Sequence, residues 1–87
     1  MDSKDKAFYL VIWNSREHIC QSCGAYLGKE PRSYMFDHLI EKKPHPELRH
    51  VAGNIFLVCL ECHNRKGRGF PTARHQAAID NAIKIFL

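Results

Sequence analysis

Four hydrophobic segments, separated by polar or glycine-containing stretches, set the pattern of the chain. The first, residues 7–13, is continuously apolar, so its periodicity does not distinguish a helix from a strand. We favour a helix over residues 4–16, because the next segment must turn sharply into a cysteine pair. Residues 34–40 and 55–58 are short and contain aromatic and branched apolar side chains, which predicts two strands.

The fourth segment belongs to a final helix that Thr72 can cap. Its apolar residues recur at i, i+3, i+4 and i+7, which predicts one packing face made of Ile79, Ala82, Ile83 and Phe86. Before it, residues 60–66 should form a short helix with Gly67 as its stop. Residues 41–53, between the two predicted strands, contain lysines, prolines and a glycine, which predicts an irregular loop.

The length of 87 residues allows one domain, residues 1–87, with a thin hydrophobic core. Hydrophobic residues make up 45% and charged residues 25%, as in ordinary soluble globular domains. A domain of this size often needs a staple, and the four cysteines offer one.

The cysteines form two Cys-x-x-Cys pairs, Cys20 with Cys23 and Cys59 with Cys62. Two such pairs separated by a long insert are typical of tetrahedral zinc coordination by thiolates. Gly24 follows the first pair and allows the backbone to turn there. We therefore predict a structural Zn²⁺ site with four cysteine ligands.

Two disulfides in a secreted protein are the alternative for these cysteines. Secretion requires a signal peptide, but the polar residues 14–17 follow the apolar residues 7–13, where a small-residue cleavage site is needed. The same apolar segment is too short to span a membrane. We expect a cytoplasmic protein without membrane contact, in which reduced cysteines bind zinc.

Polar residues suited to catalysis lie between and beside the cysteine pairs: Asp37, His38, Asn54 and His63. Sixteen residues separate Asp37 from Asn54, and eight separate Asn54 from His63. His63 directly follows Cys62, so it is turned about 100° around the helix axis. Zinc at the cysteines would therefore orient His63 without using it. The alternative, His63 as a replacement zinc ligand, is less favoured because four cysteines already fill a tetrahedron.

Residues 36–40 and 53–67 contain the Asp-His pair, the Asn-x8-His spacing and the second cysteine pair. With these motifs the chain resembles the zinc-stapled HNH endonucleases, and the resemblance covers residues 20–67. It implies an α+β fold, a small ββα-metal (treble-clef-like) finger with a four-cysteine structural zinc and flanking helices. The flanking helices themselves carry no family signal.

The resemblance also implies roles for the polar residues. His38 would be the general base, and Asn54 would hold the loop that orients it. Asp37 and His63 would ligate a catalytic divalent ion. One carboxylate and one imidazole leave several positions of an octahedral ion open for water and phosphate, which suits Mg²⁺ or Mn²⁺.

Two features depart from a simple version of this site. Neighbouring residues of a regular strand face opposite sides, so Asp37 and His38 can reach one phosphate only if the strand is bulged, twisted or ends there. Some HNH relatives have a further metal-binding histidine one helical turn beyond the position of His63, where this chain has Gly67. His50 in the preceding loop could approach the metal instead, although a solvated loop histidine is the simpler interpretation.

Thirteen Lys and Arg against nine Asp and Glu give a net charge of +4, which is compatible with a polyanionic partner. Five basic residues flank the expected site and are candidates for phosphate contacts: Lys42, Lys43, Arg65, Lys66 and Arg68. A solvated charged face would explain them equally well.

We predict an HNH endonuclease that hydrolyses phosphodiester bonds of DNA, preferably double-stranded, and nicks one strand per site. It would act as a monomer or weak dimer, with phage or restriction proteins as further partners. The alternative is a non-catalytic treble-clef zinc module that binds nucleic acid or protein, and a third interpretation is a structural domain of a larger assembly. We assign no role to His18, His45 or His75, which we interpret as surface, cap or loop residues.

Overall fold

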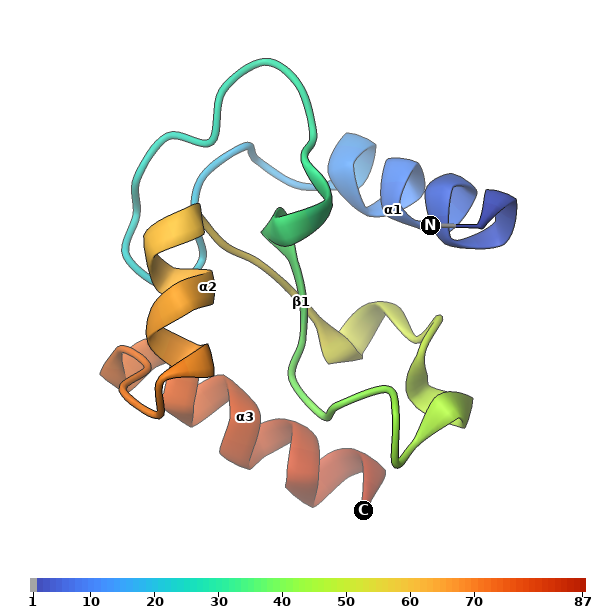
Figure 1. Ribbon diagram of the computed structural model, residues 1–87, viewed down its shortest axis with the longest axis vertical. Helices are drawn as coiled ribbons and strands as arrows, with labels where there is room; N and C mark the ends of the chain where they lie inside the picture. Colours follow the sequence, from blue (N-terminus) through green and yellow to red (C-terminus); the bar gives the residue numbers. More distant parts are fainter. Residues whose placement is uncertain (1) are drawn as a thin grey trace.

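Helices surround a small two-stranded sheet in the computed structural model, which describes residues 2–87. The order of the helices and strands is α1 (Ser3–Ser15), β1 (Phe36–His38), β2 (Ile55–Leu57), α2 (Leu60–Gly67) and α3 (Ala73–Phe86). Figure 1 shows β1 near the centre, with the three helices around it. The architecture confirms the predicted α+β class, a ββα unit with a flanking helix on each side.

The first helix and the strands lie close to their predicted positions. Helix α1 confirms the helix predicted over residues 4–16, and the carboxylate of Asp2 caps it by accepting a hydrogen bond from the backbone N–H of Asp5 at 2.8 Å. Strand β1 is shorter than the predicted 34–40, because residues 33–35 form a 3₁₀ turn and the strand ends at residue 38.

The two strands pair antiparallel, and their side chains alternate between two faces. Phe36 and His38 point toward α1, where the Phe36 ring stacks on Tyr9 with centroids 4.6 Å apart and the His38 ring lies 6.3 Å from the same tyrosine. Asp37 and its cross-strand partner Phe56 point to the opposite face and contact α3. The alternation therefore gives Asp37 and His38 different neighbours.

Two hydrophobic clusters correspond to these two faces. The larger cluster joins α1 to the sheet, and its most deeply buried members include Ile12, Leu57 and Val58. The smaller cluster lies against α3 and joins Ala82 to Leu48 in the loop between the strands. Each flanking helix is therefore held by its own set of apolar contacts.

Helix α3 begins as predicted, but its buried face differs from the predicted one. The Thr72 hydroxyl caps the helix and accepts a hydrogen bond from the backbone N–H of His75 at 3.1 Å. Ile83 is 46% exposed, so its assignment to the packing face is wrong. His75 is fully buried on that face together with Ala82, so its interpretation as a surface or cap residue is also wrong. The face follows positions 75, 79, 82 and 86, and Ile83 lies beyond its edge.

The short helix α2 extends one residue further than predicted and includes Gly67. The left-handed turn that follows is at Gly69, whose φ is +84°, a conformation that favours glycine. There the backbone N–H of Phe70 donates to the carbonyl of Arg65 at 2.9 Å. This turn redirects the chain from α2 into α3.

Candidate functional site

The four cysteines converge at one point between the first turn of α2 and the loop that follows α1. Their sulfur atoms lie within 4.8 Å of one another, and none of them forms a disulfide. The turn in the loop uses Gly24 at a φ of +85°, and the backbone N–H of Cys23 points at the sulfur of Cys20 at 3.4 Å. The cluster is positioned to hold a metal ion, and its thiolate ligand set is consistent with a structural zinc.

The thiols of this cluster titrate unequally. Burial raises the pKa of Cys62 to about 12. Burial also opposes ionisation of Cys20, but N–H donors from neighbouring backbone outweigh it and lower the pKa of that thiol to about 7. A bound cation would be needed to keep all four sulfurs ionised so close together.

Hydrogen bonds join this cluster directly to α3. Ser22, between the first two cysteines, is buried, and its hydroxyl lies 2.6 Å from the hydroxyl of Thr72. The Thr72 hydroxyl also lies within hydrogen-bond distance of the Ser22 carbonyl, to which it donates at 3.2 Å. Because Thr72 is the cap of α3, the cysteine loop fixes where that helix begins.

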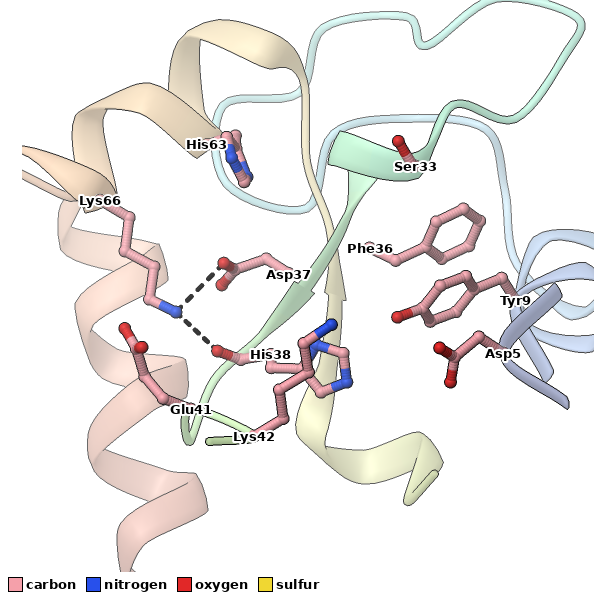
Figure 2. A pocket seen from close by; sticks show the side chains of 10 residues that line it. All are labelled: Asp5, Tyr9, Ser33, Phe36, Asp37, His38, Glu41, Lys42, His63 and Lys66. Atoms are coloured by element: carbon pink, nitrogen blue, oxygen red, sulfur yellow. Dashed lines mark hydrogen bonds and ion pairs between the residues drawn. The ribbon is translucent and has the colours of Figure 1, made fainter. Parts of the chain in front are cut away.

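A pocket of about 400 Å³ opens between β1, α1 and α2 (Figure 2). It is lined by Asp5, Tyr9, Ser33, Phe36, Asp37, His38, Glu41, Lys42, His63 and Lys66. Asp37 and His38 both line it although they lie on opposite faces of β1, because the strand ends at His38. The pocket thus combines carboxylate, imidazole and ammonium groups.

The Asp37 carboxylate is 6% exposed and both of its oxygens are hydrogen-bonded. Oδ1 accepts from the ammonium of Lys66 at 3.1 Å, and Oδ2 lies 2.8 Å from Nε2 of His75. The same ammonium donates to the backbone carbonyl of His38 at 2.6 Å, as the dashed lines in Figure 2 show. A buried carboxylate of this kind favours a cation beside it, and here the cation is Lys66.

The His38 ring is held by backbone. Its Nε2 lies 3.0 Å from the carbonyl oxygen of Arg49, and because a carbonyl can only accept, Nε2 carries the hydrogen. In the neutral ring, Nδ1 then carries the free lone pair. Burial lowers the pKa of His38, which favours this neutral form.

Asn54 is fully buried beneath the pocket and does not line it. Its side-chain oxygen accepts from the N–H of Ile40 at 2.8 Å, and its amide donates to the carbonyls of Ile40 at 3.0 Å and Leu48 at 3.3 Å. These three bonds join both ends of the loop that carries Arg49, the residue whose carbonyl holds His38.

His63 lies on the exposed side of α2 and lines the pocket from above Asp37 in Figure 2. His50 does not line the pocket, because its Nε2 is bonded to Asp5 at 2.6 Å and its ring packs on Phe8. The structure therefore does not place His50 near Asp37, where it could have served as a further metal ligand.

A family model described as HNH endonuclease matches residues 20–69, more than half of the chain. The chain belongs to the HNH endonuclease family. Membership implies a metal-dependent, nuclease-type function. A search of curated proteins and a search of solved structures each found no match to the chain.

The basic residues of this HNH chain are placed unequally. Lys42 and Lys66 line the pocket, whereas Lys43, Arg65 and Arg68 are exposed outside it. Arg65 donates from Nε to the carbonyl of residue 70 at 3.0 Å, which orients its side chain along the end of α2. Lys66 is turned inward onto Asp37, and its side chain is only 16% exposed.

Asp37 and His63 are the carboxylate and the imidazole in this pocket that could hold a divalent ion. Within residues 2–87, the cysteine cluster is the only group of three or more metal-ligating side chains with closely spaced ligand atoms. Asp37 and His63 would therefore be a two-ligand site, completed by water and phosphate oxygens.

Three residues that sequence reasoning did not assign belong to the site. His75 bonds Asp37, Asp5 lines the pocket wall opposite α2, and Glu41 lines the pocket on the side of Lys66 in Figure 2. The signal for His75 was its place in the packing face of α3, four residues before Ile79. Sequence patterns contain no such signal for Asp5, because its partners lie more than forty residues away.

Among residues 2–87, no helix is long and apolar enough to cross a membrane.

Proposed function

We propose that this HNH protein is a metal-dependent endonuclease that hydrolyses phosphodiester bonds in DNA and cuts one strand per visit. One observation carries the proposal: Asp37, His38 and His63 line the same pocket, although 24 residues separate the second from the third. Lys42 at the mouth of that pocket is suited to contact a phosphate of the bound strand.

His38 is the proposed general base. The carbonyl of Arg49 keeps the hydrogen on Nε2, so Nδ1 is the atom that takes the proton from the attacking water. A neutral imidazole is the form that can do so, and burial favours it. Asn54 contributes indirectly, because its three hydrogen bonds fix the loop that presents the Arg49 carbonyl.

Asp37 and His63 are the proposed ligands of the catalytic ion, Mg²⁺ or Mn²⁺. When bound, such an ion stabilises the negative charge that develops on the phosphate and on the leaving oxygen. Lys66 would leave the Asp37 Oδ1 atom as the ion binds, and it could then join Arg65, Arg68, Lys42 and Lys43 in contacting the DNA backbone.

A structural zinc at the four cysteines completes the proposal. It would fix the start of α2, and hence His63, relative to the loop after α1. We propose that residues 1–87 act as one unit, a monomer or weak dimer, in which a double-strand break needs two sites or two visits.

One observation favours a second candidate, a non-catalytic zinc module that binds nucleic acid or protein. The Lys66 ammonium satisfies the Asp37 carboxylate, so this carboxylate is stable without any metal. In such a module the pocket would be a structural ion-pair site, and the exposed basic residues would bind the partner.

Plasmid cleavage separates the two candidates. Zinc-loaded protein is incubated with supercoiled DNA in EDTA, Mg²⁺ or Mn²⁺, beside the His38→Ala variant. We expect metal-dependent conversion to open circle by the wild-type protein only. If folded, zinc-loaded protein binds DNA but does not nick it with either metal, the binding module is the better description.

A further inference from the structure

We infer that His75, from a helix outside the family-matched residues 20–69, is a positioning residue for the metal ligand Asp37. The inference rests on the proposed function, because it takes Asp37 as a ligand. Nε2 of His75 lies 2.8 Å from Oδ2 of Asp37, and a carboxylate oxygen can only accept, so the imidazole donates. Oδ1, which accepts from Lys66, is then the oxygen that a metal could take over from the lysine.

The His75 ring is held so that it can aim this hydrogen bond. It is fully buried, and its backbone N–H is bonded to the Thr72 cap in the first turn of α3. Its ring packs against Phe56, the cross-strand partner of Asp37, with centroids 5.1 Å apart. The helix, the cap and the aromatic contact together fix the ring relative to β1.

In the described part of the chain, the bond to Asp37 is the only hydrogen bond that this imidazole makes. Nδ1 of His75 is buried without a hydrogen-bond partner within residues 2–87. Burying an unpaired polar atom is unfavourable, so an apolar side chain would suit pure packing better at this position. The polar ring is thus explained by the hydrogen bond that it donates to Asp37.

A donor behind a carboxylate ligand restricts rotation of the carboxylate and presents one oxygen to the metal. Without His75, the Asp37 carboxylate could turn and place both oxygens toward Lys66, which strengthens its contact with the lysine and weakens its contact with a metal. Losing such a partner typically lowers metal affinity by roughly 10- to 100-fold.

The test measures Mn²⁺ binding to zinc-loaded protein by electron paramagnetic resonance, in the absence of DNA. His75→Leu removes the donor but fills the site, and we expect binding at least about tenfold weaker than wild type. His75→Gln retains an N–H donor on a side chain of similar reach and should bind Mn²⁺ nearly as well as wild type. Ala78→Gly, in the same helix, controls for a merely less stable α3, and we expect its affinity to be unchanged.

Cleavage of supercoiled DNA adds a second readout. Raising the Mn²⁺ concentration should restore nicking by His75→Leu but not by His38→Ala, because only the first defect lies in metal binding.

Mn²⁺ binding by His75→Leu equal to that of wild type overturns the inference. So does an equal loss of Mn²⁺ affinity in Ala78→Gly, or a loss in His75→Gln as large as in His75→Leu. A wild-type protein that binds no Mn²⁺ overturns it too. Wild-type protein that binds Mn²⁺ but never cleaves DNA refutes the proposed function alone, and the binding series still decides the role of His75.

Discussion

Asp37 and His38 are neighbours on β1, but the two halves of the molecule hold them by different means. The Asp37 side is built from side chains: Lys66 of α2 and His75 of α3 each bond one carboxylate oxygen. The His38 side is built from backbone: the carbonyl of Arg49 receives the ring hydrogen.

The difference has a physical reason. A carboxylate buried away from water needs charged or polar partners on both oxygens, and here side chains from two packed helices supply them. A base needs one nitrogen fixed and the other free, and one carbonyl is sufficient for that. As the proposed metal ligand, Asp37 is therefore sensitive to the identity of distant residues, whereas His38, the proposed base, is sensitive to the shape of the loop that carries the carbonyl.

Removing the ion from the cysteine cluster should have the largest effect, because both sides depend on it. We expect Cys59→Ala, or exhaustive chelation, to unfold the domain, since structural zinc contributes on the order of 10 kcal/mol to folding in small fingers. Far-UV circular dichroism with zinc quantification measures this. A metal-free protein that melts at the wild-type temperature would contradict the structural role of the cluster.

Separate substitutions of His38 and Asp37 should distinguish the roles of the two residues. His38→Ala should lower the rate of cleavage by roughly 10²- to 10⁴-fold, with Mn²⁺ affinity unchanged. Asp37→Asn should instead weaken Mn²⁺ binding. Single-turnover cleavage and metal titration on both variants measure the two effects. If both variants lose metal binding equally, the division between the two sides is wrong.

We expect a smaller effect on stability from removing the ion pair between Asp5 and Arg49, the residue whose carbonyl holds His38. Asp5 is buried in α1 and accepts hydrogen bonds from Arg49, and these bonds hold the pKa of Asp5 well below its usual range. A carboxylate with a lowered pKa stabilises the fold above its unfolded pKa of about 4, and this stability is lost as the pH falls toward its folded pKa.

Asp5→Asn should accordingly lower the melting temperature at pH 7 by roughly 5–10 °C and make stability less dependent on pH below about 5. Thermal melts between pH 7 and pH 3 measure both changes. Asp2→Asn is the matched control, because Asp2 also bonds Arg49 but is largely exposed and should matter less. Equal effects of the two substitutions would show that burial of Asp5 is not what counts.

The smallest effect is expected at Lys66, and its sign is informative. Lys66→Met removes the ammonium that bonds Asp37, so Mn²⁺ should bind roughly three- to tenfold more tightly. Lys42→Met, in the same pocket without that contact, should change Mn²⁺ affinity less. Calorimetric titration compares them. Weaker Mn²⁺ binding by Lys66→Met would mean that the lysine supports the metal and does not compete with it.

The features that could be predicted from the sequence are those that depend on residues close together in the chain. The Cys-x-x-Cys pairs and the capping residue Thr72 follow from spacing and residue type within a few positions. The helix over residues 3–15 was favoured only because the next segment must turn, since its apolar run fits a strand equally well. The strand ends were less predictable: the apolar pattern continues through residues 34–35, which form part of a 3₁₀ turn before β1.

The supports of the site could not be predicted from such patterns, because they join residues far apart in the chain. His75 and Asp37 are 38 positions apart, and Arg49 and Asp5 are 44 apart. Each pair meets only after a helix has packed on its face of the hairpin. The motif residues were found as a set, but the hydrogen bonds that hold them were not.

The hydrogen bond between Ser22 and Thr72 bears on how short a fragment of this HNH chain can be made while the site stays supported. A fragment limited to the family-matched residues 20–69 keeps the cysteines and every motif residue, but it loses α1 and α3. Its cysteine loop would lose its contact with the α3 cap, Asp37 would lack one of its two donors, and Arg49 would lack its carboxylate partner in α1. The segment that matches the family is therefore shorter than the shortest fragment that we expect to keep the site supported, which also needs α1 and α3.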